Sequence, residues 1–188
     1  MTDDPLATLR SMIERFEQLG IPYMVVGSIA ALVHGRSRAT QDFDVVVELD
    51  PARLKALLAS LPEGRFYFSE AAALDALRRE SLFNVIDNET GWKVDVVPRK
   101  RREFSRVEFE RRRELTFSGF KVVVASIEDT LIAKLEWSKI AGGSARQLED
   151  ARELVRIGGA ALDRAYLEHW ISELGLEQAW SQVSSASC

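Results

Sequence analysis

Hydrophobic residues follow two different periods along the chain. From Leu6 to Leu19, apolar side chains recur in steps of three and four, which predicts a helix with one buried face. Residues 23–27 and 42–49 are instead apolar runs of strand length. Over the whole chain, the pattern predicts strands at 23–27, 42–49, 65–68, 81–87 and 93–98 and a hairpin at 115–125. It predicts helices at 5–20, 28–35, 52–61, 70–80, 127–140, 145–157 and 162–183.

Three short signals support the ends of these elements. Asp50 followed by Pro51 is typical of a helix start, because Asp caps free backbone N–H groups and Pro fits the first turn. Ser126 and Asp129 resemble a capping box. Ser-Gly at residues 118–119, between two β-rich runs, is typical of a tight hairpin turn.

The order of the elements predicts the fold class. Strands and helices are mixed in residues 1–125, and only helices follow in residues 126–188. We therefore predict an α+β (α/β) fold, in which a mixed β-sheet is flanked by helices and the C-terminal helical region packs on this core as one compact unit. A chain of 188 residues can bury enough surface to fold without a disulfide or a structural metal.

Composition narrows the expected partners and compartment. The formal net charge of -4 argues against a dedicated nucleic-acid-binding protein, although it leaves room for a local basic patch. The single cysteine, Cys188, cannot form an internal disulfide, and the N-terminus lacks the basic start and apolar centre of a signal peptide. No stretch reaches the roughly 18 uncharged apolar residues that a membrane span requires. We therefore expect a cytoplasmic protein without a membrane partner.

Three aspartates stand on predicted strands in a pattern that suggests a metal site. Alternate side chains of a strand point to opposite faces, so Asp42 and Asp44 share a face while Phe43 points into the core. Asp95 lies likewise between two valines of a later strand. If the strands are neighbours, the three carboxylates converge and repel one another, and magnesium would relieve that repulsion. Taken singly, each aspartate also fits a structural role without chemistry. Asp42 could be a cap or turn residue, Asp44 a charge on an edge strand, and Asp95 a surface residue paired with Lys93.

The residues before the aspartate pair suggest a phosphate site. Gly27 and Ser28 end a predicted strand where a helix starts, and a helix N-terminus offers free N–H groups to a phosphate. The glycine permits close approach, and the Ser28 hydroxyl can add a hydrogen bond. Arg36 and Arg38 could neutralise further phosphate charge, although both also fit ordinary loop positions.

This ordered set of residues resembles the nucleotidyltransferase superfamily, which has the DNA polymerase β-like fold. The resemblance lies in Gly27-Ser28 at the end of a strand, Asp-x-Asp at 42–44 on the next strand and Asp95 on a later strand. Within it, "RSRATQDFDVVV" resembles the form in which Arg and Thr precede the aspartates. "SIEDTLIAKLEWSK" followed by "ARQLEDARELV" resembles the abortive-infection and toxin–antitoxin nucleotidyltransferases of bacteria. The similarity extends over roughly residues 23–157.

The resemblance implies a role for each residue of the set. Asp42 and Asp44 would bind two magnesium ions, and Asp95 would complete the metal site and act as base toward the incoming hydroxyl. The residues that would contact the nucleoside triphosphate are Gly27, Ser28, Arg36, Arg38, Thr40 and Lys134. Lys134 fits equally well as a surface lysine whose stem lies along an apolar helical face.

The implied reaction is magnesium-dependent transfer of a nucleoside monophosphate from a nucleoside triphosphate to a hydroxyl, with release of pyrophosphate. The toxin–antitoxin resemblance implies an acceptor that is RNA, such as tRNA, or a cognate toxin or antitoxin protein. An aminoglycoside-like small molecule is the alternative acceptor. A non-catalytic nucleotide sensor or antitoxin with the same fold is a further alternative, which an ion pair between Asp95 and Lys93 would favour. A metal-dependent phosphohydrolase would need histidines near the carboxylates, and only His34 is available.

Residues 99–114 form a basic segment in an acidic protein, with eight basic and four acidic side chains. The segment fits a solvent-exposed helix with ion pairs along its surface, and it also fits a patch for RNA phosphates or an acidic partner. The helix interpretation is favoured, because few aromatic residues are interleaved. Trp137, Trp170 and Trp180 fit apolar helical faces better than a base-stacking site.

Overall fold

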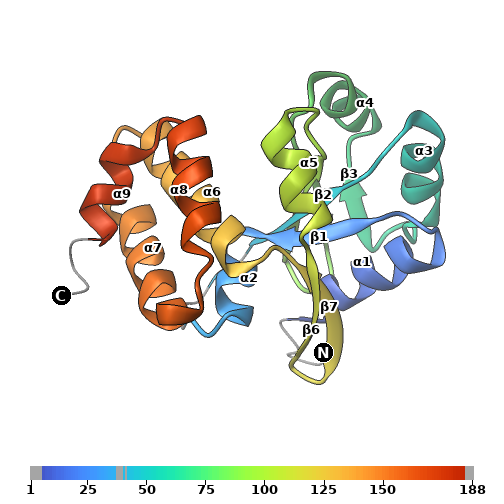
Figure 1. Cartoon of the computed structure of the whole chain (residues 1–188). Coiled ribbons are helices and arrows are strands. Elements are labelled where there is room, and N and C mark those ends of the chain that lie inside the picture. Colours follow the sequence, from blue (N-terminus) through green and yellow to red (C-terminus); the bar gives the residue numbers. More distant parts are fainter. Residues whose placement is uncertain (1–5, 37–39, 41, 185–188) are drawn as a thin grey trace.

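The structure, a computed structural model, describes residues 6–36, 40 and 42–184 of the chain. It has a mixed sheet with helices on both faces, and a cluster of C-terminal helices stands beside the sheet (Figure 1). The predicted fold class is therefore confirmed: the chain is a mixed α/β protein whose mixed sheet is flanked by helices.

The sheet contains seven strands of the described chain in the order β3-β4-β5-β2-β1-β7-β6. The central pair β2 and β5 is parallel, and so is the pair β1 and β7, whereas the other neighbours are antiparallel. The strands are β1 (Tyr23–Val26), β2 (Asp42–Val47), β3 (Phe66–Phe68), β4 (Phe83–Asp87), β5 (Lys93–Pro98), β6 (Arg113–Phe117) and β7 (Phe120–Val124).

The helices fall into those that cover the sheet and those that form the C-terminal cluster. The first group is α1 (Ala7–Gln18), α2 (Gly27–Val33), α3 (Pro51–Ser60), α4 (Glu70–Arg79) and α5 (Glu103–Glu110). The second group is α6 (Ile127–Ile140), α7 (Ala145–Gly158), the short 3-10 helix η1 (Gly159–Ala161), α8 (Arg164–Glu173) and α9 (Glu177–Ser184).

The two faces of the sheet have different covers. Helices α1, α3 and α4 pack on one face and form the main hydrophobic core, to which β2 contributes Phe43 and β5 contributes Val96, both fully buried. On the opposite face, Phe109 of α5 packs against Met24 of β1. Strand alternation therefore directs the side chains at positions 42, 44 and 95 away from the main core, toward the face with α5.

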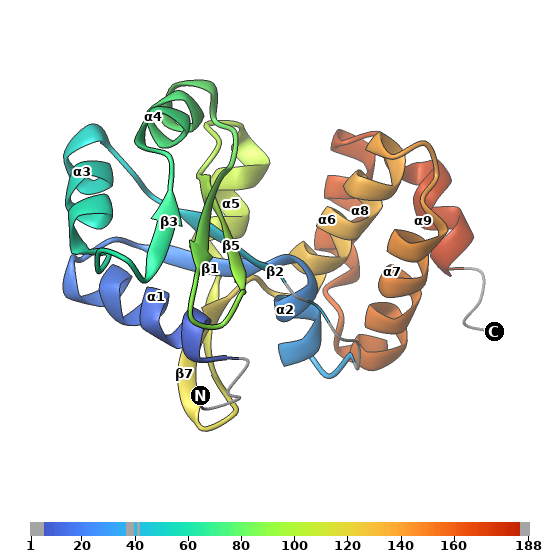
Figure 2. The same ribbon diagram turned by 180° about the vertical axis from the view of Figure 1, so that it is seen from behind.

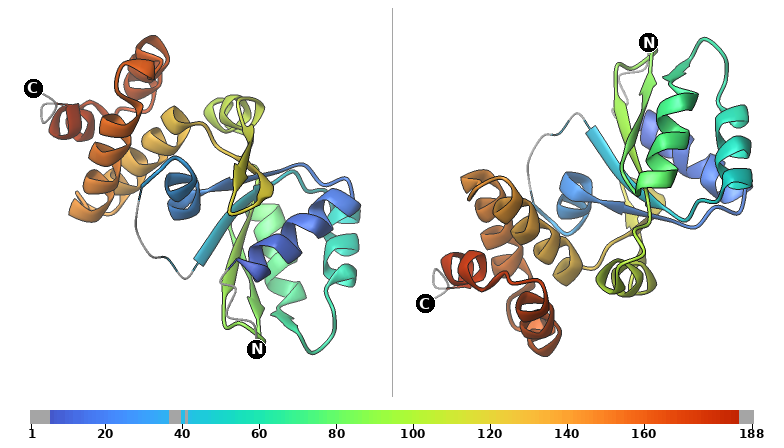
Figure 3. Two further views of the ribbon diagram at one scale, coloured as in Figure 1. Left: turned by 90° about the horizontal axis from the view of Figure 1, so that it is seen from below. Right: turned by 90° about the horizontal axis from the view of Figure 1, so that it is seen from above.

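A second hydrophobic core joins the C-terminal helices to the sheet region. It is centred on side chains of α6, α7 and α8 such as Leu131, Leu154 and Trp170. Phe104 of α5 packs against Trp170 with 5.0 Å between ring centroids, and Ala31 of α2 belongs to the same core. Figure 3 shows α2 lying between the sheet and the C-terminal helices. Helices α2 and α5 thus belong to residues 1–125 by sequence, yet they pack against residues 126–188.

The three local signals read from the sequence are confirmed. The Asp50 side chain accepts a hydrogen bond from Arg53 N at 2.8 Å, and the Ser126 hydroxyl accepts one from Asp129 N at 3.1 Å. At the β6–β7 turn, residues 118 and 119 have φ values of 46° and 82°. Positive φ at both central residues is the geometry of a tight hairpin turn.

Two expectations about the C-terminal helices are wrong. The single helix expected over residues 162–183 is divided into α8 and α9 at Gly175. Gly175 has φ of 62°, a left-handed conformation that ends a helix and that glycine adopts more easily than any other residue. The following Leu176 is buried in the second core, which explains why the chain turns there. Trp137 does not fill an apolar helical face, because 58% of its surface is exposed.

Within the described residues, no helix combines the length and apolar character needed to cross a bilayer.

Candidate active site

The parallel pairing of β2 with β5 brings the three predicted aspartates together. Asp44 and Asp95 are directly paired across the two strands, and Asp42 is paired with Lys93. Figure 2 shows these two strands side by side, next to α2 and α6. Because residues two apart share a face and paired residues lie opposite one another, all three carboxylates stand on one face of the sheet. We call Asp42, Asp44 and Asp95 the aspartate site.

Asp44 lies directly against the first residue of α2. Asp44 is paired with Val26 at the end of β1, and Gly27 follows. A Cβ atom on Gly27 would lie 2.2 Å from Asp44 Oδ2, closer than any real contact, and Gly27 has φ of 66°. Only glycine therefore combines this backbone conformation with this approach of a carboxylate.

The charge of Asp44 is poorly compensated. Burial raises the pKa of Asp44 to about 6, and the charges of Asp95 and Asp42 also raise it, while Lys134 and Lys93 lower it. A carboxylate in this state gains from any cation that comes close.

Asp95 is held by two neighbours on its own sheet face. Lys93 Nζ lies 3.1 Å from Asp95 Oδ2, and the side-chain amide of Asn84 on β4 donates a hydrogen bond to Asp95 Oδ1. The same ammonium lies 3.5 Å from Asp42 Oδ1. The ion pair between Asp95 and Lys93 was foreseen as a possibility from their spacing, whereas Asn84 was missed. Asn84 lies on the neighbouring strand β4 and belongs to no motif read from the sequence, so only its pairing with Asp95 reveals it.

The aspartate site suits a hard divalent cation by its donor chemistry. Magnesium prefers carboxylate oxygens together with substrate phosphates. The pKa of Asp44 is raised first by burial and then by the charge of Asp95, so its ionised form would be stabilised by such a cation. In the described part of the chain, no three His, Cys, Asp or Glu residues are gathered closely enough to form a ready-made metal cluster. Lys93 stands between two of the three carboxylates. The residues that could hold the metal are Asp42, Asp44 and Asp95, once Lys93 has moved aside.

Two of the predicted phosphate contacts belong to a separate ion cluster. Asp150 on α7 lies 2.5 Å from Arg36 Nη2 and 3.0 Å from Lys134 Nζ, and at most 8% of any of these side chains is exposed. We call these three residues the Asp150 cluster. It ties the segment after α2 to α6 and α7, so Arg36 is turned toward a carboxylate of the protein. Lys134 also influences the aspartate site, since its charge lowers the pKa of Asp44.

Asp150 was not singled out from the sequence. It stands one residue from Ala151, on the edge of the apolar face of α7, and a carboxylate beside such a face is a weak signal of burial. The identity of its partners depends entirely on how α6 and α7 pack.

The other predicted residues have varied positions. Ser28 lies in the first turn of α2. The Thr40 hydroxyl bonds to the backbone of Asp42, accepting from its N–H at 3.3 Å, so it stabilises the start of β2. Arg38 lies outside the described residues. His34 contacts the Ala125 carbonyl through Nε2 at 2.8 Å, which is a structural role.

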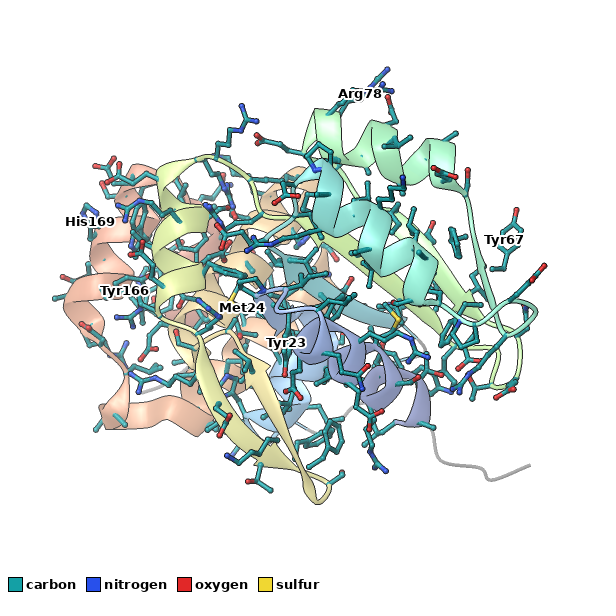
Figure 4. All side chains as sticks on the ribbon, turned by 90° about the vertical axis from the view of Figure 1, so that its right-hand side faces the viewer. Tyr23, Met24, Tyr67, Arg78, Tyr166 and His169 are labelled. Atoms are coloured by element: carbon teal, nitrogen blue, oxygen red, sulfur yellow. The ribbon has the colours of Figure 1, made fainter. Side chains whose placement is uncertain are left out.

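The basic segment 99–114 is largely neutralised by carboxylates of the same chain. At the start of α5, Arg102 forms two hydrogen bonds with Glu136 of α6, at 2.6 and 2.7 Å. At its end, Arg111 lies 3.6 Å from a Glu128 oxygen and 3.8 Å from the centre of the Tyr166 ring. Figure 4 shows Tyr166 on the side of α8 that faces α5. Further pairs are Arg99–Glu48, Arg101–Glu80 and Arg106–Glu110. The helix interpretation is thus correct only in part: α5 covers Glu103–Glu110 and carries the pair Arg106–Glu110, whereas most of the other pairs join the segment to other elements.

Comparison with known proteins agrees with this geometry. Residues 6–153 match the model of a family described as nucleotidyltransferase of unknown function (DUF6036), and the chain belongs to that family. The resemblance to the nucleotidyltransferase superfamily is thus confirmed, and the protein is an enzyme of the nucleotidyl-transferring class. No curated protein sequence is significantly similar to this chain.

Solved structures with low sequence identity share the fold. One is an antigenic nucleotidyltransferase-like protein from Paracoccidioides brasiliensis, with 18% identity, a TM-score of 0.61 and coverage of 97% of this chain and 93% of that protein. ANT(2")-Ia in complex with adenylyl-2"-tobramycin has 13% identity, a TM-score of 0.63 and coverage of 90% and 98%. The lincosamide antibiotic adenylyltransferase LnuA, with lincomycin bound, has 15% identity, a TM-score of 0.55 and coverage of 79% and 95%. The fold is thus that of a nucleotidyltransferase over nearly the whole chain.

Proposed function

We propose that this enzyme transfers a nucleoside monophosphate from a nucleoside triphosphate to a hydroxyl group, with magnesium held by the aspartate site. The observation that carries the proposal is the convergence of three carboxylates on one face of paired strands, with Asp44 and Asp95 directly opposite each other. Burial and the charges of Asp95 and Asp42 raise the pKa of Asp44, so a divalent cation at this position would be stabilised.

Each residue of the site has a distinct part in the proposed reaction. Magnesium, when bound, neutralises charge on the triphosphate and on the departing pyrophosphate. Asp95 takes the proton of the acceptor hydroxyl, and Asn84 keeps its carboxylate oriented. Gly27 and Ser28, in the first turn of α2, offer backbone N–H groups to the phosphates. Lys134 adds a positive charge near Asp44, and Asp150 keeps this lysine in place.

A small hydroxyl compound is the acceptor that the observations favour. Several arginines of segment 99–114 that an RNA backbone would require, such as Arg99, Arg102 and Arg106, are engaged with carboxylates of this chain. Two proteins of the same fold, which match this chain over nearly all of their own length, were solved with an adenylylated aminoglycoside and with a lincosamide bound. RNA or a partner protein is the alternative acceptor, which the similarity to toxin–antitoxin enzymes implies.

One observation favours a second function. Lys93 pairs with both Asp95 and Asp42, and such an internal cation is what a non-catalytic nucleotide sensor would need in order to keep its carboxylates without metal. In that case the protein would bind nucleotide without transferring it.

Label transfer distinguishes these functions. The protein is incubated with magnesium, one α-labelled nucleoside triphosphate at a time, and an aminoglycoside panel, tRNA or a cell lysate. Label on an acceptor that is lost in the double variant Asp42→Asn, Asp44→Asn supports the transferase and identifies the acceptor class. Magnesium-dependent nucleotide binding without transfer to any acceptor supports the sensor. Absence of nucleotide binding would refute both.

A further inference from the structure

Lys93 occupies a position between two carboxylates of the aspartate site. It lies on β5 two residues before Asp95, so both side chains share a face, and it is directly opposite Asp42 on β2. Its ammonium lies 3.1 Å from Asp95 Oδ2 and 3.5 Å from Asp42 Oδ1. The other oxygen of Asp95 is engaged by Asn84. The lysine therefore uses the carboxylate oxygens that a cation bound by Asp42 and Asp95 would use.

We propose that Lys93 is a tethered cation that compensates part of the charge of the aspartate site without metal and makes the binding of a divalent cation depend on the nucleotide. This inference rests on the proposed function, because it takes the aspartate site as the metal site. It adds a role for a residue that lies outside the nucleotidyltransferase pattern of aspartates, glycine and serine.

Electrostatics gives the reason for this dependence. A divalent cation that enters alone must displace the ammonium from two carboxylates, and it then lies close to a lysine that has lost both partners. A nucleoside triphosphate brings negative charge of its own, so the displaced ammonium gains phosphate oxygens as new partners. Metal and nucleotide together therefore supply positive charge to Asp42 and Asp95 and new partners to the ammonium of Lys93, whereas metal alone supplies only the first.

The side chain of Lys93 is able to make this movement. About a third of it, 36%, is exposed, so its unbranched stem can turn toward solvent. Lys134 offers the contrast: only 6% of its side chain is exposed, and Asp150 holds it at 3.0 Å. Of these two lysines, Lys93 is the one with access to solvent, and Lys134 is the one enclosed by the protein.

The test measures binding of Mn²⁺, a spectroscopic substitute for magnesium, by electron paramagnetic resonance, with and without a non-hydrolysable nucleoside triphosphate analogue. In the wild-type protein, we expect weak Mn²⁺ binding alone and much tighter binding with the analogue. In Lys93→Met, the affinity for Mn²⁺ alone should rise about tenfold, because the competing charge is gone. The analogue should then increase the affinity much less than it does in the wild type.

Two control variants make the result specific. Lys93→Arg keeps the cation and should retain the wild-type dependence on nucleotide. Lys55→Met removes an exposed lysine of α3 and should change nothing. Thermal unfolding without metal verifies that each variant is folded, and Lys93→Met should gain more stability from Mn²⁺ than the wild type does.

Two results would overturn the inference in different ways. Equal Mn²⁺ affinity of the wild type and Lys93→Met, with equal enhancement by the analogue, would refute the role of Lys93 and leave the proposed function intact. Failure of both proteins to bind Mn²⁺ even with the analogue would refute the metal site and the inference together.

Discussion

The aspartate site and the Asp150 cluster are two groups of charged residues that Lys134 connects, and their charge balance is opposite. In the Asp150 cluster, one buried carboxylate has two cations within 3.0 Å. In the aspartate site, the partly exposed Lys93 pairs with two of the three carboxylates, and the pKa of the third, Asp44, is raised by burial and by its acidic neighbours. A carboxylate that is compensated by cations inside the protein serves the fold, whereas carboxylates with too few cations around them are prepared for a ligand.

The largest effect is expected from Asp44→Asn, which should lower the transfer rate at least about 10³-fold. Its stability at pH 7 should be equal to that of the wild type or higher. The raised pKa means that native Asp44 binds a proton more tightly than the unfolded chain does, so stability decreases as pH rises from the usual carboxyl range through about 6. Asparagine cannot ionise and avoids this loss. Initial transfer rates and urea unfolding measure the two quantities.

Asp75→Asn provides the matched control, because Asp75 is a surface carboxylate on α4 that is paired only with exposed arginines. It should leave the rate and the stability unchanged. Full activity of Asp44→Asn, or a stability loss similar to that of a buried ion-pair variant, would contradict the distinction between the two clusters.

Asp150→Ala should mainly affect stability, with a decrease of about 3–5 kcal/mol in the free energy of unfolding. Removal of this carboxylate leaves Arg36 and Lys134 as buried cations without their shared partner. Urea unfolding at pH 7 measures the change.

The matched control for Asp150 is the triple replacement Asp150→Leu, Arg36→Met, Lys134→Met. It removes all three charges and should cost less stability than Asp150→Ala alone. If the triple variant is the less stable of the two, the attraction between Asp150 and its two cations stabilises the protein more than apolar packing at the same positions does.

Gly27→Ala should lower both stability and activity. A residue with a side chain at φ of 66° costs about 1–2 kcal/mol, and the new Cβ atom would also displace Asp44. Gly20→Ala is the control, since Gly20 has φ of 60° and nothing within 4 Å of the added atom. Gly20→Ala should lose only the stability that the positive φ costs, whereas Gly27→Ala should lose more because of its clash with Asp44, and only Gly27→Ala should lose transfer activity. Equal activity of the two would show that the contact with Asp44 has no functional importance.

The smallest effect concerns Glu108 of α5, whose pKa is raised to about 8 by burial and then by the charge of Asp129. The native protein binds this proton more tightly than the unfolded chain, so wild-type stability should decrease as pH rises from about 4.5 to 8. Glu108→Gln should make this decrease smaller, because glutamine does not ionise, and it should leave the transfer rate unchanged. Unfolding in urea at several pH values measures it. Glu110→Gln on the same helix removes an exposed carboxylate and should leave the pH dependence as it is.

The sequence alone determined the parts of the fold that depend on neighbours in the chain. The caps at Asp50 and Ser126 and the turn at residues 118–119 follow from residues within three or four positions. The common face of Asp42 and Asp44 follows from the period of a strand. The division of residues 162–183 was not evident, because Gly175 interrupts a helical period that otherwise continues on both sides.

The tertiary structure decided the partners of each charged residue. Sequence could place Asp95 on a strand, but only the parallel pairing of β2 with β5 puts it opposite Asp44, with Lys93 opposite Asp42. Sequence likewise offered Arg36 and Lys134 as phosphate contacts, and packing of α6 and α7 gave both to Asp150. Coulombic interaction acts through space at a few ångströms, whereas sequence patterns report only the direction of a side chain along its own element. The residue types of the site could therefore be read from the sequence. Their division into the Asp150 cluster and the aspartate site arose only on folding.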